Sequence, residues 1–137
     1  MAIYGRFLVN GEARYALIDG ETARFVDGIF GKVQITGETS PVEELEILPP
    51  VTPSKLMAIG LNYADHAKET NAQIPKEPII FFKSTTALIG PNDDVIIPKN
   101  SKKTDWEVEL AIVIGKKTSY VEESEALNYV AGYCLHN

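Results

Sequence analysis

The sequence predicts an α+β protein that is mainly β. Short apolar runs alternate with turn signals such as "NGE" at residues 10–12 and "DGE" at residues 19–21, where Asn, Asp and Gly tolerate a positive φ. The run "WEVELAIVI" at residues 106–114 alternates in the way that a strand does. Only two stretches, at residues 60–70 and 122–129, have the composition of short helices.

The sequence pattern of the N-terminal part predicts a small β-meander. Residues 3–26 read as short strands joined by the two turns. In the polar stretch that follows, Pro49, Pro50 and Pro53 fix φ and lack an amide donor, so the chain is expected to be extended there. We place a boundary near residue 50, with a small β domain at residues 1–50 and a second domain at residues 51–137.

For the second domain, residues 51–137, the sequence pattern predicts strands and two short helices. In "GLNYADHAKET", Asn62 is expected to cap a helix that has Asp65 in its first turn. The run "EPIIFFK" is β-like, and "GPNDD" is a turn that leads into the apolar residues 95–97. The expected order is a strand at 56–59, a helix at 60–70, a strand at 77–83, a turn at 90–94, a strand from 105, a helix at 122–129 and a strand at 130–137.

Composition narrows the range of partners and compartments. The 19 acidic residues outnumber the 13 basic ones, and no Lys/Arg cluster is present that could follow a nucleic-acid backbone. Cys134 is the only cysteine, so an internal disulfide and a thiolate zinc site are excluded, and we expect a cytoplasmic protein. The N-terminus has no apolar signal region, and the longest aliphatic run, at residues 110–114, is too short to span a bilayer.

The acidic strand allows two interpretations. Alternation gives one face Trp106, Val108, Leu110, Ile112 and Ile114, which we expect to be a core face, and the other face Asp105, Glu107, Glu109, Ala111 and Val113. The acids either decorate a solvated face, or Glu107 and Glu109 lie where solvent is scarce, because the same face turns apolar at Ala111. Close carboxylates repel unless one is protonated or a cation lies between them. Their hard oxygens suit Mg²⁺, Mn²⁺ or Ca²⁺.

His66 and Glu69 form a second candidate pair. They are three residues apart in "YADHAKE" and therefore share a face of the expected helix. A carboxylate beside an imidazole fixes its tautomer and raises its basicity, as a general base for water requires. The alternative is a solvated helix with an incidental histidine, because His-x-x-Glu alone is a weak motif.

The order and spacing of these motifs resemble the fumarylacetoacetate hydrolase family. "GLNYADHAKE", "EPIIFFK", "GPNDDVIIP", "DWEVELAIVIGK" and "NYVAGYCLHN" carry the resemblance from about residue 56 to residue 137. Residues 1–50 resemble the N-terminal domain of the shorter prokaryotic members. The resemblance implies a mixed β-roll that holds Mg²⁺ or Mn²⁺ and a substrate that is a 2-oxo acid or a 1,3-diketo acid.

Carried over to this sequence, the resemblance makes Glu107 and Glu109 metal ligands, and His66 with Glu69 the pair that activates water. Asp105 and Lys83 are left out of the site. The family's third ligand is an aspartate after the "GY" strand, whereas this sequence stops at Asn137, so we expect an incomplete β-roll.

The implied activity is a metal-dependent hydrolase or decarboxylase that cleaves a carbon-carbon bond through an enolate. Its substrate would resemble acylpyruvate, oxaloacetate or fumarylacetoacetate. A homodimer is expected, with no nucleic-acid or membrane partner. Two alternatives stay open: a truncated, non-catalytic β-domain or assembly module, and an isomerase of a 2-hydroxy-dienoate.

Overall fold

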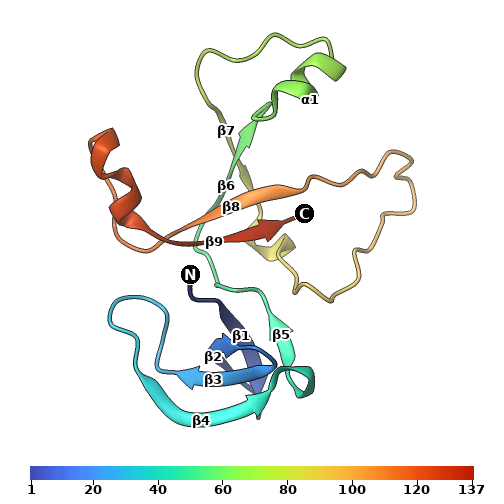
Figure 1. The fold of residues 1–137 in the computed structure, drawn as a ribbon. Coiled ribbons are helices and arrows are strands. Elements are labelled where there is room, and N and C mark those ends of the chain that lie inside the picture. Colours follow the sequence, from blue (N-terminus) through green and yellow to red (C-terminus); the bar gives the residue numbers. More distant parts are fainter. The chain divides into compact units, whose positions relative to one another are not determined.

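The computed structural model describes residues 1–137 and is mainly β, as predicted. Nine strands form three antiparallel sheets, accompanied by one α-helix and three 3-10 helices (Figure 1). None of the helices has the length and hydrophobicity of a membrane span. Contacts group Met1–Pro50 with Gly90–Asn137 in one compact unit and leave Val51–Ile89 as another. The division into domains at residue 50 stays a prediction.

The N-terminal sheet has five strands in the order β4-β3-β2-β1-β5. Two-residue turns join β1 to β2 and β2 to β3, and φ is positive at Asn10, Gly11 and Gly20, which is the geometry that tight hairpins need. The predicted meander is confirmed. The elements are β1 (Tyr4–Val9), β2 (Glu12–Asp19), β3 (Thr22–Val26), β4 (Ile35–Pro41), η1 (Val42–Glu44) and β5 (Glu46–Leu48).

One face of this sheet carries a small core of Phe7, Ala16, Ala23 and Phe25. Ala16 lies opposite Phe25 in the β2–β3 register, and the small alanines leave room for the two rings. Partly buried side chains from β1, β2, β5 and the η1 segment pack against this cluster: Val9, Ile18, Val42, Leu45 and Ile47. Gly5 belongs to the same face, where a Cβ atom would lie 2.5 Å from Cζ of Phe7. The phenyl ring therefore occupies the space that a side chain at residue 5 would need.

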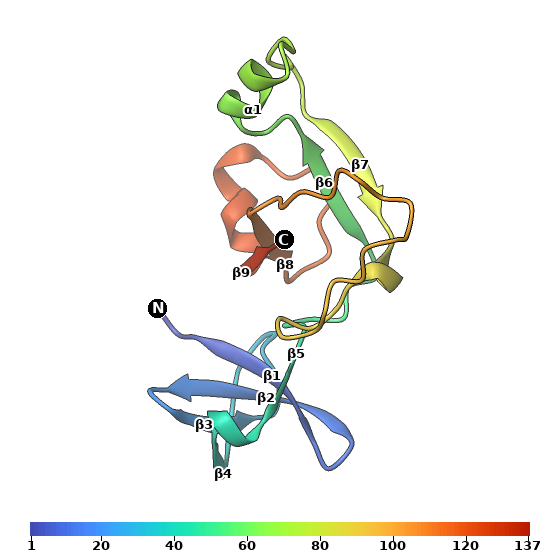
Figure 2. The same cartoon turned by 90° about the vertical axis from the view of Figure 1, so that its right-hand side faces the viewer.

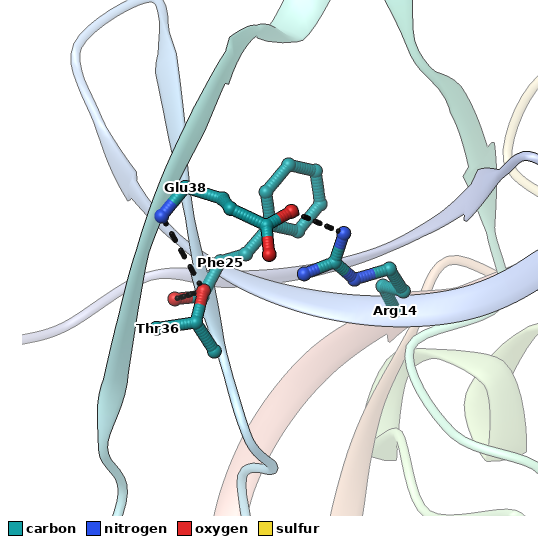
Figure 3. Close-up of polar contacts among 4 residues, drawn as sticks. All are labelled: Arg14, Phe25, Thr36 and Glu38. Carbon is teal, nitrogen blue, oxygen red and sulfur yellow. Dashed lines mark hydrogen bonds and ion pairs between the residues drawn. The ribbon is translucent and has the colours of Figure 1, made fainter.

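Three polar side chains, those of Arg14, Thr36 and Glu38, lie next to Phe25 at the edge of this core (Figure 3). Nη1 of Arg14 donates a 2.7 Å hydrogen bond to Oε2 of Glu38, and the guanidinium lies 4.3 Å from the centroid of the Phe25 ring. Thr36 Oγ1 donates to the carbonyl oxygen of Phe25 at 3.2 Å. The hydrogen bond from Arg14 lowers the pKa of Glu38, and the same bond raises the pKa of Arg14.

The unit Val51–Ile89 is a two-stranded ribbon with a short helix. β6 (Leu56–Gly60) pairs with β7 (Ile79–Lys83), and α1 (Ala64–Glu69) lies at one end of this ribbon (Figure 2). A 3-10 helix, η2 (Thr85–Ala87), follows β7. Both predicted strands and the predicted helix are present. Ala67 is the only buried residue of the unit, and even Phe82 is 69% exposed.

The expected cap of α1 is wrong. The N-cap residue is Tyr63, which has extended backbone angles, and no side chain makes a cap hydrogen bond. Leu61, in the turn after β6, has a positive φ. The helix begins at Ala64, so the residue at the N-cap position is Tyr63 and not Asn62.

Residues 88–108 contain neither helix nor strand. The predicted turn at residues 90–94 is confirmed, because the amide of Asp93 donates to the carbonyl of Gly90 and Oδ2 of Asp93 accepts from the amide of Gly90. The apolar residues 95–97 are exposed and lie outside any strand.

A second ribbon follows, formed by β8 (Glu109–Ile114) and β9 (Val130–His136), with η3 (Glu123–Tyr129) between them. The last predicted strand and the short helix before it are confirmed, the helix as a 3-10 helix. The expected core face is not buried: Trp106, Val108, Leu110, Ile112 and Ile114 are 53–77% exposed. The two-stranded ribbon therefore leaves this apolar face exposed.

Candidate metal and catalytic site

The two candidate metal ligands lie at the start of β8. The predicted strand from Asp105 begins four residues late, at Glu109, because Val108 has φ +52° and interrupts the extended backbone. Glu109 is half-buried, whereas Glu107 precedes the strand and is exposed. The direction of the Glu107 side chain therefore depends on the turn at Val108, and the strand alternation that we predicted for this pair does not apply.

The end of β9 lies beside this pair. The β8–β9 register places His136 opposite Glu109, and Cβ atoms of directly opposed residues are about 5 Å apart. Oδ1 of Asn137 accepts hydrogen bonds from the amides of Glu107, at 3.0 Å, and Val108, at 3.3 Å. His136 and Asn137 are neighbours of the candidate ligands that the sequence reasoning missed. Antiparallel pairing of "WEVELAIVI" with "VAGYCLHN" was the signal that could have identified them.

The face of the ribbon that carries Glu109 is the more enclosed one. Glu109, Ala111 and Val113 are half-buried, as are the facing residues Cys134 and His136. Burial raises the pKa of the Cys134 thiol. Glu109 thus lies at the end of a half-buried, mostly apolar surface, whereas Glu107 is exposed. The assignment of the two glutamates as metal ligands stays a prediction.

His66 and Glu69 lie on α1, in the unit Val51–Ile89, whereas Glu107 and Glu109 belong to the other unit. Both side chains on α1 are exposed. They make no hydrogen bond or ion pair with each other, and the backbone oxygen of His66 accepts from Thr70 Oγ1 at 2.8 Å. Ala67 faces the interior of the unit, so the helix has a fixed inner side and an accessible outer side.

A cavity of about 240 Å³ lies next to α1 in the same unit. The segments before and after the helix line it, and they include Asn62, Lys76 and Glu77. Neither His66 nor Glu69 is among its lining residues. Another cavity, of about 350 Å³, lies on the N-terminal sheet and contains none of the candidate residues.

The donors of the candidate metal site fit a hard cation, but their number is small. No three His, Cys, Asp or Glu side chains of the chain gather to hold a metal ion. Carboxylates such as those of Glu107 and Glu109 suit Mg²⁺ or Mn²⁺, which prefer oxygen ligands and keep several waters. Asp105 accepts the amide hydrogen of Trp106 at 2.9 Å, a local contact consistent with leaving it out of the ligand set.

The chain matches two family models. Residues 55–137 match the model described as fumarylacetoacetate hydrolase C-terminal, and residues 4–50 match the model described as Rv2993c-like, N-terminal. All four candidate residues lie within the first match.

Individual proteins show the same similarity. The mitochondrial oxaloacetate tautomerase FAHD2A of Bos taurus is 50% identical over 96 residues, which cover 69% of this chain and 31% of that protein. The structure of 5-carboxymethyl-2-hydroxymuconate delta-isomerase from Mycobacterium smegmatis has a TM-score of 0.86 and 31% identity, and the match covers 98% of this chain and 53% of that chain. The chain thus spans about a third to a half of the length of these relatives. The match over more than half of its residues shows that the chain belongs to the fumarylacetoacetate hydrolase family.

Proposed function

We propose that the full-length protein is a divalent-metal-dependent hydrolase or decarboxylase of a 2-oxo or 1,3-diketo acid. One observation carries the proposal: the family match over residues 55–137 contains a Glu-x-Glu pair beside a half-buried face and a His-x-x-Glu pair on the exposed side of a helix. The tautomerase of Bos taurus is named for oxaloacetate, which is a 2-oxo acid. This name supports the substrate class.

In this proposal Glu107 and Glu109 hold Mg²⁺ or Mn²⁺ together with further ligands. When bound, such a cation supplies Lewis-acid stabilisation of the negative charge that develops on substrate oxygens, typically worth several kcal/mol. The cation and the two carboxylates would neutralise each other's charge. Because the acidic face is then no longer negative, a substrate carboxylate can approach it.

His66 is the proposed general base, and Glu69 is its orienting partner. In a hydrolase, the imidazole takes a proton from the water that attacks the substrate carbonyl, a role typically worth about 10² to 10⁴ in rate. The exposed outer side of α1 leaves both side chains free to meet substrate. Their mutual hydrogen bond is expected to form in the complex, because catalytic hydrogen bonds often tighten only there.

A tautomerase or isomerase is the second candidate. The names of the Bos taurus tautomerase and of the Mycobacterium smegmatis isomerase favour it. The same residues would serve, with His66 moving a proton between carbon and oxygen of the substrate in place of activating water. This reaction breaks no carbon-carbon bond and releases no pyruvate, which makes the two candidates separable by product.

The test uses the full-length protein with oxaloacetate and acylpyruvates as substrates. Treatment with EDTA should abolish turnover, and Mg²⁺ or Mn²⁺ should restore it. Release of pyruvate identifies a hydrolase or decarboxylase, whereas keto-enol conversion without pyruvate identifies a tautomerase. Turnover that survives complete removal of metal would contradict the proposal.

The assembly and location belong to the same proposal. We expect a homodimer in the cytoplasm, without a nucleic-acid or membrane partner. Sedimentation of the purified full-length protein tests the dimer, and a monomer at all concentrations would exclude it. The 137-residue chain alone is expected to bind Mg²⁺ weakly, because two carboxylates leave most of the water shell of the cation in place.

A further inference from the structure

Two consecutive backbone amides converge on one side-chain oxygen beside the candidate ligands. The amides of Glu107 and Val108 donate to Oδ1 of Asn137 at 3.0 and 3.3 Å. The regular β8–β9 ladder ends at the pair Glu109 and His136. The side chain of Asn137 thus continues the pairing by one step, with an amide oxygen in the place of a main-chain carbonyl.

This contact lies where the backbone departs from the strand. Val108 has φ +52°, a conformation that a β-branched residue rarely adopts and that persists only where its surroundings hold it. Successive amides around a left-handed residue point to the same side and form a small concave donor site. In this chain the neutral oxygen of Asn137 fills that site.

The turn at Val108 decides how Glu107 is directed relative to Glu109. In an uninterrupted strand the two side chains would share a face about 6.6 Å apart along the chain. With the turn in place, the direction of Glu107 follows from the φ of Val108, and the contact with Asn137 lies at this turn.

We propose that Asn137 is a positioning residue that holds the Glu107–Val108 turn and so sets the direction of the Glu107 carboxylate. Its consequence for metal binding rests on the proposed function, whereas its effect on the turn does not. Asn137 itself need not touch metal or substrate.

The test compares four forms of the full-length protein: the unmodified protein, Asn137→Leu, Asn137→Asp and Asn128→Leu. Leucine has a similar size but no acceptor, whereas aspartate keeps an oxygen at the same place. Asn128 is the matched control, because its exposed amide bonds Glu125 at 2.6 Å in the same unit and does not touch the turn.

The first readout is hydrogen exchange of the Glu107 and Val108 amides in metal-free protein. Exchange should accelerate roughly 2- to 10-fold in Asn137→Leu, the range expected for one lost hydrogen bond, and stay unchanged in Asn137→Asp and Asn128→Leu. The second readout is calorimetric affinity for Mn²⁺, which should fall about 10-fold in Asn137→Leu. It should not fall in the other two variants, and all four proteins should melt within a few degrees of one another.

The outcomes separate the inference from the proposed function. Unchanged amide exchange in Asn137→Leu overturns the inference, and so does faster exchange with undiminished Mn²⁺ affinity. Failure of the unmodified protein to bind Mn²⁺ overturns the proposed function. In that case amide exchange alone decides whether Asn137 holds the turn.

Discussion

The N-terminal sheet and the β8–β9 ribbon both alternate apolar and polar residues, yet only the sheet buries its apolar face. Phe7 and Phe25 are 2% and 3% exposed, whereas Leu110 and Ile112 are more than half exposed. In the sheet, β1, β2, β5 and the η1 segment bring further apolar side chains onto the rings. The ribbon has two strands and no such cover. Alternation therefore identifies an apolar face, but only further strands or a covering segment make it a core.

The largest effect is expected from removing a ring from the core of the sheet. Phe7→Ala should lower the free energy of unfolding by about 3–5 kcal/mol, because a cavity replaces a side chain that is 2% exposed. Phe82→Ala on β7 is the matched control, since that ring is 69% exposed and should cost less than about 1 kcal/mol. Urea unfolding of the 137-residue chain measures both. Equal losses would remove the contrast between the sheet and the ribbons.

The next effect separates function from stability in the ribbon. Glu109→Gln in the full-length protein should reduce turnover at least about 100-fold, because it removes a charged donor from the proposed metal site. The melting temperature should change little, since Glu109 is only half-buried. Glu125→Gln, on the exposed helix η3, is the control. A variant that keeps its turnover would remove Glu109 from the ligand set.

A smaller loss is expected where the sheet is tightly packed. Gly5→Ala would place a Cβ atom 2.5 Å from Cζ of Phe7, so the ring must move, at a cost of about 1–3 kcal/mol. Adding Phe7→Leu should make the two losses less than additive, because both changes act on one contact. Gly132→Ala on β9 is the control, since nothing lies within 4 Å of its Cβ position. Thermal unfolding of the unmodified chain, Gly5→Ala, Phe7→Leu and the double variant measures this coupling, with Gly132→Ala measured beside them. Strictly additive losses would show that the ring already lies elsewhere.

Ile112→Ala on β8 should cost less than about 1 kcal/mol in the 137-residue chain, because its side chain is 54% exposed and leaves no cavity. Urea unfolding gives the value. A loss as large as that of Phe7→Ala would mean that the apolar face of the ribbon is covered in solution. The sheet and the ribbon would then not differ in burial.

The smallest effect concerns the polar edge of the sheet. Because the hydrogen bond from Arg14 lowers the pKa of Glu38, this contact stabilises the fold above the ordinary carboxyl pKa and is lost as pH falls through the lowered pKa. Melting temperatures measured from pH about 5 down to pH about 2 should therefore fall less steeply in Glu38→Gln than in the unmodified chain. Glu43→Gln, which replaces an exposed glutamate on η1 outside the Arg14–Glu38 pair, is the control. Identical slopes in all three would show that the pair does not form in solution.

Local signals predicted most of the secondary structure. The turns at Asn10 and Gly20 need only the residues that form them, and α1 and β7 follow from composition over a few residues. The same holds for β9. These elements depend on neighbours in sequence, so the sequence alone was sufficient to predict them.

The missed features depend on pairs that are distant in sequence. The left-handed backbone at Val108 and its contact with Asn137 join residues 29 positions apart, and no local rule assigns a positive φ to a valine. The register that brings His136 opposite Glu109 is likewise a property of two strands. Sequence patterns proposed Glu107 and Glu109 as a pair, but no local pattern showed the turn at Val108 that lies between them.

Cys134 gives the ribbon an internal chemical reporter. It is the only cysteine in the 137 residues, and it lies opposite Ala111 on the half-buried face. Since burial raises its pKa, the thiolate that reacts with iodoacetamide is scarce at neutral pH while β9 stays paired with β8. Separation of the two strands would expose the thiol and speed its alkylation. The labelling rate of the unaltered chain should therefore rise when the strand next to Glu109 opens more often.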